Sequence, residues 1–212
     1  MRRGPRLPLE SLQPYLLTVP DPVVPLDWAA VFGNPYPVEL EVGSGKGLFL
    51  LSASENHPNV NYVGVEIVRK YQLYTATRLA KRQRTNVRVA CADARLFLRD
   101  CVRTGSLQAL HIYFPDPWWK KRHQKRRVFT AEFVDQAIRV LSTRGRLCAA
   151  TDVEDYYHRM QELLKTHPEL RSLPPPEPGT PAHDLDYLTN FERKFRKQGK
   201  PIFRLSYEPV VG

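Results

Sequence analysis

Blocks of apolar residues alternate with polar segments between residues 37 and 167, and their spacing predicts secondary structure. Short apolar runs rich in β-branched residues predict strands, whereas longer segments with an apolar residue at every third or fourth position predict helices. We expect strands at 37–42, 61–67, 86–93, 107–116 and 145–152. We expect helices at 46–56, 68–84, 131–142 and 153–167.

Strands that alternate with helices predict βαβ units and therefore a parallel sheet that is covered on both faces. The expected fold class is α/β, with a doubly wound, mostly parallel, Rossmann-like sheet. Ligands of such sheets bind just beyond the carboxyl ends of the strands. Residues directly after each strand are therefore the first candidates for a functional site.

Proline-rich stretches divide the chain. Six prolines lie between residues 14 and 37, and we interpret residues 1–36 as a Pro-rich leader before a single folded domain at 37–212. The segment PPPEPGTP at 174–181 is a second irregular stretch. Both could be plain surface connectors.

The charge balance narrows the class of partner. The 212 residues carry a formal net charge of +10, which favours nucleic acid or a membrane surface. No apolar run approaches the roughly 18 residues of a membrane span, and the N-terminus lacks the apolar region of a signal peptide. Cys91, Cys101 and Cys148 form no CxxC pair, which fits a reduced cytoplasmic protein without zinc or disulfides.

The turn after the first expected strand, LEVGSGKG, indicates a nucleotide cofactor. It is not a P-loop, because Leu40 replaces the first glycine and Gly47 replaces the hydroxyl residue, and a leucine also replaces the third glycine of a dinucleotide fingerprint. What remains is Glu41 followed by Gly43 and Gly45. Glycines let the backbone approach a ligand closely, and the acid suits an ammonium group, which points to S-adenosylmethionine. The alternative is a tight turn without a ligand.

Two further acids follow the next two strands. Glu66 lies about 20 residues beyond the glycines, where an acid accepts hydrogen bonds from ribose hydroxyls in nucleotide-binding folds. Asp93 could contact the adenine amino group. The alternatives are a solvated acid for Glu66 and a helix N-cap for Asp93. Three acids after three successive strands indicate a nucleotide-cofactor site more specifically together than any one of them does alone.

The stretch YFPDPWWKKRHQKRR at 113–127 follows the fourth strand and would face the reactive end of the cofactor. Asp116 could instead be a helix N-cap, with Pro117 at the first helical position. Trp118 or Trp119 could stack on a base. We expect the cationic side chains that follow to bind RNA phosphates. These side chains are Lys121, Arg122, His123, Lys125, Arg126 and Arg127.

With these motifs the chain resembles the bacterial tRNA (guanine-N7-)-methyltransferases, from about residue 14 onwards. The most specific pieces are PDPWWKKRHQKRR, the late TNFERKF, and the GKPIFRL that follows. The resemblance implies a Rossmann-like methyltransferase sheet and Asp116 as the catalytic acid. The implied S-adenosylmethionine contacts are Glu41, Gly43, Gly45, Glu66, Asp93 and Asp116. The implied substrate contacts are Lys120, Asp152 and the TxxE motif, which consists of Thr189, Asn190, Phe191 and Glu192.

The resemblance also implies methyl transfer to guanine N7 in tRNA, at the variable-loop guanine (position 46 in tRNA numbering). Guanine N7 carries a lone pair and no proton, so the transfer requires no general base. Because the product base is positively charged, we expect Asp116, helped by Asp152 or Glu192, to act by position and electrostatics. No metal is implied. We expect a cytoplasmic monomer or homodimer that binds tRNA, with no membrane contact and no obligate protein partner.

Three alternatives stay open. The TxxE motif and TDVE at 151–154 are also capping boxes, which begin helices. An enzyme that methylates an amino nitrogen would carry D/N-P-P-aromatic after strand four, whereas the Pro-Asp-Pro-Trp of this chain is one residue out of that pattern. A non-catalytic RNA-binding protein would not need the three acids at the strand ends.

Overall fold

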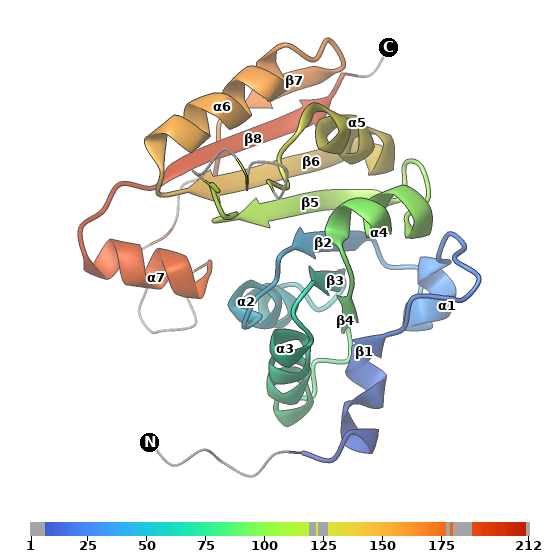
Figure 1. The fold of residues 1–212 in the computed structure, drawn as a ribbon. Helices are drawn as coiled ribbons and strands as arrows, with labels where there is room; N and C mark the ends of the chain where they lie inside the picture. The colour runs from blue at the N-terminus through green and yellow to red at the C-terminus, as the bar shows by residue number, and fades with distance from the viewer. Residues whose placement is uncertain (1–6, 119–121, 123–126, 177–178, 180–187, 211–212) are drawn as a thin grey trace.

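The computed structural model describes residues 7–118, 122, 127–176, 179 and 188–210, and these contain one eight-stranded sheet (Figure 1). The strands are β1 (Leu16–Leu17), β2 (Val38–Val42), β3 (Asn61–Glu66), β4 (Val87–Cys91), β5 (Leu107–Tyr113), β6 (Leu141–Thr151), β7 (Leu170–Leu173) and β8 (Phe203–Pro209). Their order is β1-β4-β3-β2-β5-β6-β8-β7. Strands β1 to β6 pair in parallel, and β8 pairs antiparallel with β6 and β7.

The helices are η1 (Glu10–Tyr15, a 3-10 helix), α1 (Trp28–Phe32), α2 (Leu48–Asn56), α3 (Arg69–Lys81), α4 (Ala94–Cys101), α5 (Ala131–Val140), α6 (Glu154–Lys165) and α7 (Asn190–Lys197). The strand order runs outward from β2 in both directions. Right-handed crossovers therefore put α2 and α3 on one face and α4, α5 and α6 on the other (Figure 1). The reversal lies between β2 and β5, where doubly wound sheets bind ligands.

Two buried apolar clusters join the sheet to its helices. Leu40 and Val42 of β2 belong to the cluster that also contains Phe133 of α5. The second cluster contains Phe49 of α2 and Leu79 of α3. Because successive side chains of a strand point to opposite faces, the acids that alternate with Leu40 and Val42 lie on the α2 face.

Every strand and helix that the apolar pattern predicts is present, and the expected α/β fold class is confirmed. The pattern missed η1, β1, α1, α4, β7 and β8. Part of the leader joins the sheet, since β1 pairs with β4, and Leu12 and Tyr15 of η1 are buried. In the part of the chain that the structure describes, no helix combines the length and the apolar character needed to cross a membrane.

The second expected capping box, at 151–154, is wrong. Thr151 is the last residue of β6, and its hydroxyl accepts a hydrogen bond from the Val153 amide at 3.2 Å. Helix α6 begins at Glu154 after Val153, which has no side chain that could cap it. Because β6 ends at Thr151 and α6 begins only at Glu154, the threonine lies too far before the helix to cap it.

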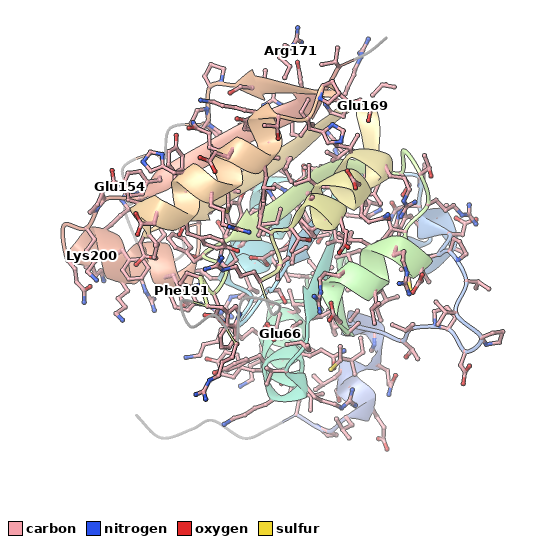
Figure 2. The ribbon with its side chains drawn as sticks, turned by 45° about the horizontal axis from the view of Figure 1, so that its top comes forward. Glu66, Glu154, Glu169, Arg171, Phe191 and Lys200 are labelled. Carbon is pink, nitrogen blue, oxygen red and sulfur yellow. The ribbon has the colours of Figure 1, made fainter. Side chains whose placement is uncertain are left out.

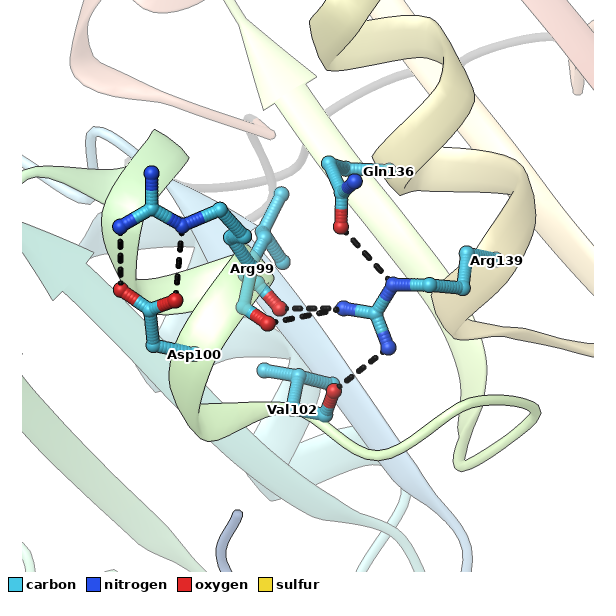
Figure 3. A network of polar contacts seen from close by, with 6 residues as sticks. Arg99, Asp100, Val102, Gln136 and Arg139 are labelled. Atoms are coloured by element: carbon cyan, nitrogen blue, oxygen red, sulfur yellow. Dashed lines mark hydrogen bonds and ion pairs between the residues drawn. The ribbon is translucent and has the colours of Figure 1, made fainter. Parts of the chain in front are cut away.

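A half-buried arginine, Arg139 of α5, supports the end of α4 (Figure 3). Its guanidinium donates to the main-chain oxygens of Leu98 and Val102 at 2.6 and 3.0 Å. Gln136 holds the same guanidinium at 2.8 Å. Carbonyls at the end of a helix lack intrahelical donors, so a cation placed there stabilises the fold.

Candidate active site

The chain turns sharply after β2. Gly43, Gly45 and Gly47 have φ angles of 73, 52 and 66°, a left-handed region that favours glycine. A Cβ added at Gly43 would meet no atom within 4 Å, so the space beside the turn is open to a ligand. A Cβ at Gly47 would instead collide with Thr75, so this glycine allows α2 to pack closely against α3.

Glu41, the acid before the turn, is buried, and its Oε2 has no hydrogen-bond partner among the described residues. Burial raises the pKa of Glu41 to about 8; His111 lowers it and Glu66 raises it further. A buried carboxyl oxygen without a donor is costly unless the group is protonated or a ligand supplies the donor. The ammonium group of S-adenosylmethionine would be such a donor, so the residues present fit this cofactor.

Glu66 lies at the end of β3 (Figure 2). Its Oε2 accepts a hydrogen bond from the Gly45 amide at 2.8 Å, and its Oε1 accepts one from the Val68 amide at 2.9 Å. The carboxylate therefore connects the glycine turn to the start of α3. Each carboxylate oxygen has a second lone pair for a ribose hydroxyl, so the expected cofactor contact stays a prediction.

Asp93 is the N-cap of α4. Its Oδ1 accepts from the Arg95 amide at 2.9 Å, and the Arg95 guanidinium binds the two carboxylate oxygens at 3.1 and 2.7 Å. These hydrogen bonds from Arg95 hold the pKa of Asp93 below its usual value. The capping role is confirmed, and an adenine contact, which stays a prediction, would compete with Arg95.

A polar chain that the sequence did not predict lies beside Glu41 and contains a buried histidine, His111. His111 Nε2 is 2.9 Å from Glu39 Oε2, and His111 Nδ1 is 2.8 Å from the Tyr113 hydroxyl. Burial lowers the pKa of His111, but Cys148 and Glu39 raise it, to about 9. Spacing along the sequence gives no sign of this chain. It becomes visible only when β2 is paired with β5.

Asp116 lies in an irregular loop after β5. Phe114 and Trp118, on either side of it, have φ angles of 53 and 43°. Such left-handed values cost a non-glycine residue about 1–3 kcal/mol and persist only where neighbours enforce them. The Phe114 amide donates to Ala150 O at 2.7 Å. Asp116 is exposed and Pro117 is not helical, so the alternative that this acid is a helix N-cap is wrong.

Arg127 holds the other end of this loop. Its Nε donates to Pro117 O at 2.7 Å and its Nη2 to Trp118 O at 3.4 Å. Its guanidinium lies 5.8 Å from the centre of the Tyr156 ring. The residue is only 8% exposed. The structure thus gives Arg127 a structural role in place of the expected phosphate contact.

Other expected contacts near this loop stay predictions. Arg122 is exposed, and Asp152 is half-buried directly after β6. The expected contacts that lie outside the described residues are Lys120, Lys121, His123, Lys125 and Arg126.

Thr189 and Glu192 cap α7, as the sequence alternative suggested. Thr189 Oγ1 accepts from the Glu192 amide at 3.0 Å, and Glu192 Oε2 accepts from the Leu188 amide at 2.9 Å. The other Glu192 oxygen binds Arg204 at 2.6 Å, and the side chain is fully buried. A direct substrate contact of Glu192 would require this buried ion pair to open.

Phe191 is the exposed member of an aromatic cluster and projects from α7 (Figure 2). Its ring centre lies 6.0 Å from that of Phe114 and 6.2 Å from that of Phe195. Asn190, at the start of the same helix, accepts a hydrogen bond from Arg193 at 3.3 Å. The ring contact between Phe114 and Phe191 therefore holds α7 beside the loop that carries Asp116.

Comparison with solved structures identifies the fold. The 16S rRNA methyltransferase KamB matches with a TM-score of 0.58 at 15% identity, over 87% of this chain and 93% of that one. A 30S ribosomal A1408 methyltransferase from an uncultured bacterium matches with a TM-score of 0.55 at 13% identity, over 89% and 96%. The fold is that of the Rossmann-like, S-adenosylmethionine-dependent methyltransferases.

Sequence relatives define the group within this class. A family model described as "Putative methyltransferase" matches residues 35–205. The tRNA (guanine-N(7)-)-methyltransferase of Rhodopirellula baltica is 43% identical over 96% of this chain and 76% of its own length. The enzyme of that name from Haemophilus influenzae (strain PittGG) is 36% identical over 86% and 74%. The chain belongs to the tRNA (guanine-N(7)-)-methyltransferase family.

Proposed function

We propose that this protein transfers the methyl group of S-adenosylmethionine to N7 of a guanine in tRNA, and that this guanine lies in the variable loop. The observation that carries the proposal is the set of four acids at or just beyond the carboxyl ends of β2, β3, β4 and β5 in a chain of this family. The net charge of +10 suits a polyanionic substrate.

The residues around the glycine turn would hold the cofactor, which, when bound, supplies an electrophilic methyl group on a sulfonium. Gly43 and Gly45 let the backbone approach it. Glu41 accepts from the ammonium group, and Glu66 accepts from the ribose hydroxyls. Both acids are buried, and hydrogen bonds to a carboxylate are stronger where water is excluded.

Asp116 would act on the base rather than on a proton. Positive charge grows on the guanine during the transfer, and a carboxylate fixed nearby stabilises that charge more in the transition state than in the ground state. The backbone around Asp116 is held at Phe114 by Ala150 and at Pro117 by Arg127. This support positions the carboxylate before the base arrives.

Mapping the methyl group on bulk tRNA tests the proposal. After reaction with labelled S-adenosylmethionine, nuclease digestion and mass spectrometry should find 7-methylguanosine in the variable loop. tRNA with adenosine in place of that guanine should accept no label. A methyl group on an exocyclic nitrogen, or cofactor binding without any transfer, would contradict the proposed reaction. 7-Methylguanosine at another position would contradict only the variable-loop assignment.

A further inference from the structure

Helix α3 carries a basic face without a carboxylate. No Asp or Glu occurs between Arg69 and Arg84. Lys70, Tyr74, Arg78 and Arg82 follow one another at intervals of four residues, so they form one row along the helix surface. A helix of 13 residues is about 20 Å long, which makes the row an extended surface.

Two tyrosines make this row unlike an ordinary solvated face. Tyr71 and Tyr74 are 39% and 51% exposed. The Arg78 guanidinium lies 6.0 Å from the centre of the Tyr74 ring. Exposed aromatic rings beside cations are the elements with which proteins bind unpaired bases and the phosphates between them.

The row extends to the glycine turn, where the cofactor would bind. Arg78 Nη1 donates to Lys46 O at 2.5 Å, which ties α3 to the glycine turn. Burial lowers the pKa of Arg78, and the neighbouring cations Arg82 and Arg193 lower it further. Since Arg193 belongs to α7, cations from the two helices approach one another here.

We propose that the α3 face binds a second segment of the substrate tRNA, through its phosphates and unpaired bases, while the target guanine lies beside Asp116. The α3 face consists of Lys70, Tyr71, Tyr74, Arg78, Lys81 and Arg82. This inference rests on the proposed function, because it concerns the same tRNA. It assigns part of the tRNA affinity to a helix that does not carry the reacting groups.

Neutralisation of exposed cations tests the phosphate contacts. The α3 variant is K70Q/K81Q/R82Q, and the control variant R144Q/R146Q/K165Q removes the same charge at exposed positions of β6 and α6. The α3 variant should bind tRNA at least about tenfold more weakly and flatten the slope of log affinity against log salt by roughly two to three units. The control variant should keep the wild-type slope. Cofactor affinity and the single-turnover rate at saturating tRNA should stay unchanged in both.

Paired substitutions of the tyrosines test the base contacts. Y71A/Y74A should weaken tRNA binding at least about fivefold, whereas Y71F/Y74F, which keeps the rings, should bind like the wild type. If Y71A/Y74A binds tRNA with wild-type affinity, the inferred contacts between the tyrosines and bases are wrong.

The inference is overturned if the α3 variant keeps the wild-type affinity and salt slope. It is also overturned if the α3 variant loses binding only to anionic phospholipid vesicles. Either result would leave the proposed reaction intact, because wild-type methylation of tRNA tests that reaction separately.

Discussion

Substitution of Arg127 tests whether this residue holds the loop around Asp116 in its observed conformation. Arg127→Met keeps most of the side-chain stem and removes the donors. The 2.7 Å hydrogen bond from Nε to Pro117 O involves a charged donor and contributes about 1.5–3 kcal/mol. The 3.4 Å bond to Trp118 O is too long to add much. The contact with the Tyr156 ring adds about 0.5–1 kcal/mol.

Arg127→Met therefore removes about 2–4 kcal/mol of interactions that stabilise this loop. The strain of its two left-handed residues is of similar size and is then no longer offset. The loop should therefore leave its observed conformation for much of the time, and the Asp116 carboxylate should move away from its position. A displacement of about 1 Å at a reacting group can slow a reaction about 100-fold. We expect methyl transfer in Arg127→Met to be about 10- to 100-fold slower, and Arg127→Lys to be intermediate because it keeps one donor.

Single-turnover methylation with saturating tRNA and cofactor measures this step without interference from binding. The matched control is Arg139→Met, which also removes a guanidinium from main-chain carbonyls but lies between α4 and α5. Both variants should lose stability, and only Arg127→Met should lose rate. The salt dependence of tRNA binding should stay unchanged in Arg127→Met. A wild-type transfer rate would refute the role of Arg127 in holding the loop, and a flatter salt slope would show that Arg127 binds phosphate.

Three further predictions concern the acids and the buried histidine. Glu66→Ala should weaken S-adenosylmethionine binding by about 1.5–3 kcal/mol in calorimetry and leave tRNA affinity unchanged; unaltered cofactor affinity would refute the ribose contact. Asp116→Asn should keep cofactor binding but slow single-turnover transfer by about 10²–10³-fold, and a wild-type rate would rule out its electrostatic role. Glu41 and His111 have pKa values raised to about 8 and 9, so both hold a proton more tightly when folded. Since the ordinary pKa values of these two groups are 4.5 and 6.5, the free energy of unfolding should fall as the pH rises from about 4.5 to about 9. Glu41→Gln should reduce this slope below about pH 8 in chemical denaturation.

The sequence predicted the order of strands and helices because apolar periodicity reports directly which faces of the sheet are buried. It also located Glu41, Glu66 and Asp93, because the carboxyl ends of parallel strands meet at one edge. It could not assign Arg127, since a buried cation and a phosphate-binding cation look alike in a run of basic residues. It missed the contact between Glu39 and His111, because only the pairing of β2 with β5 brings these distant positions together.

The distribution of charge explains how one protein can attract a polyanion and also gather acids at its active site. Glu192 is buried against Arg204, the half-buried Glu39 contacts His111, and Asp93 is held by Arg95. Burial favours the neutral form of Glu41, so it adds little negative charge in the free protein at neutral pH. The net charge of +10 still gives the protein a positive long-range field, which favours approach of tRNA. Asp116 is exposed beyond β5, and we expect its carboxylate to act at short range on the base whose charge becomes positive.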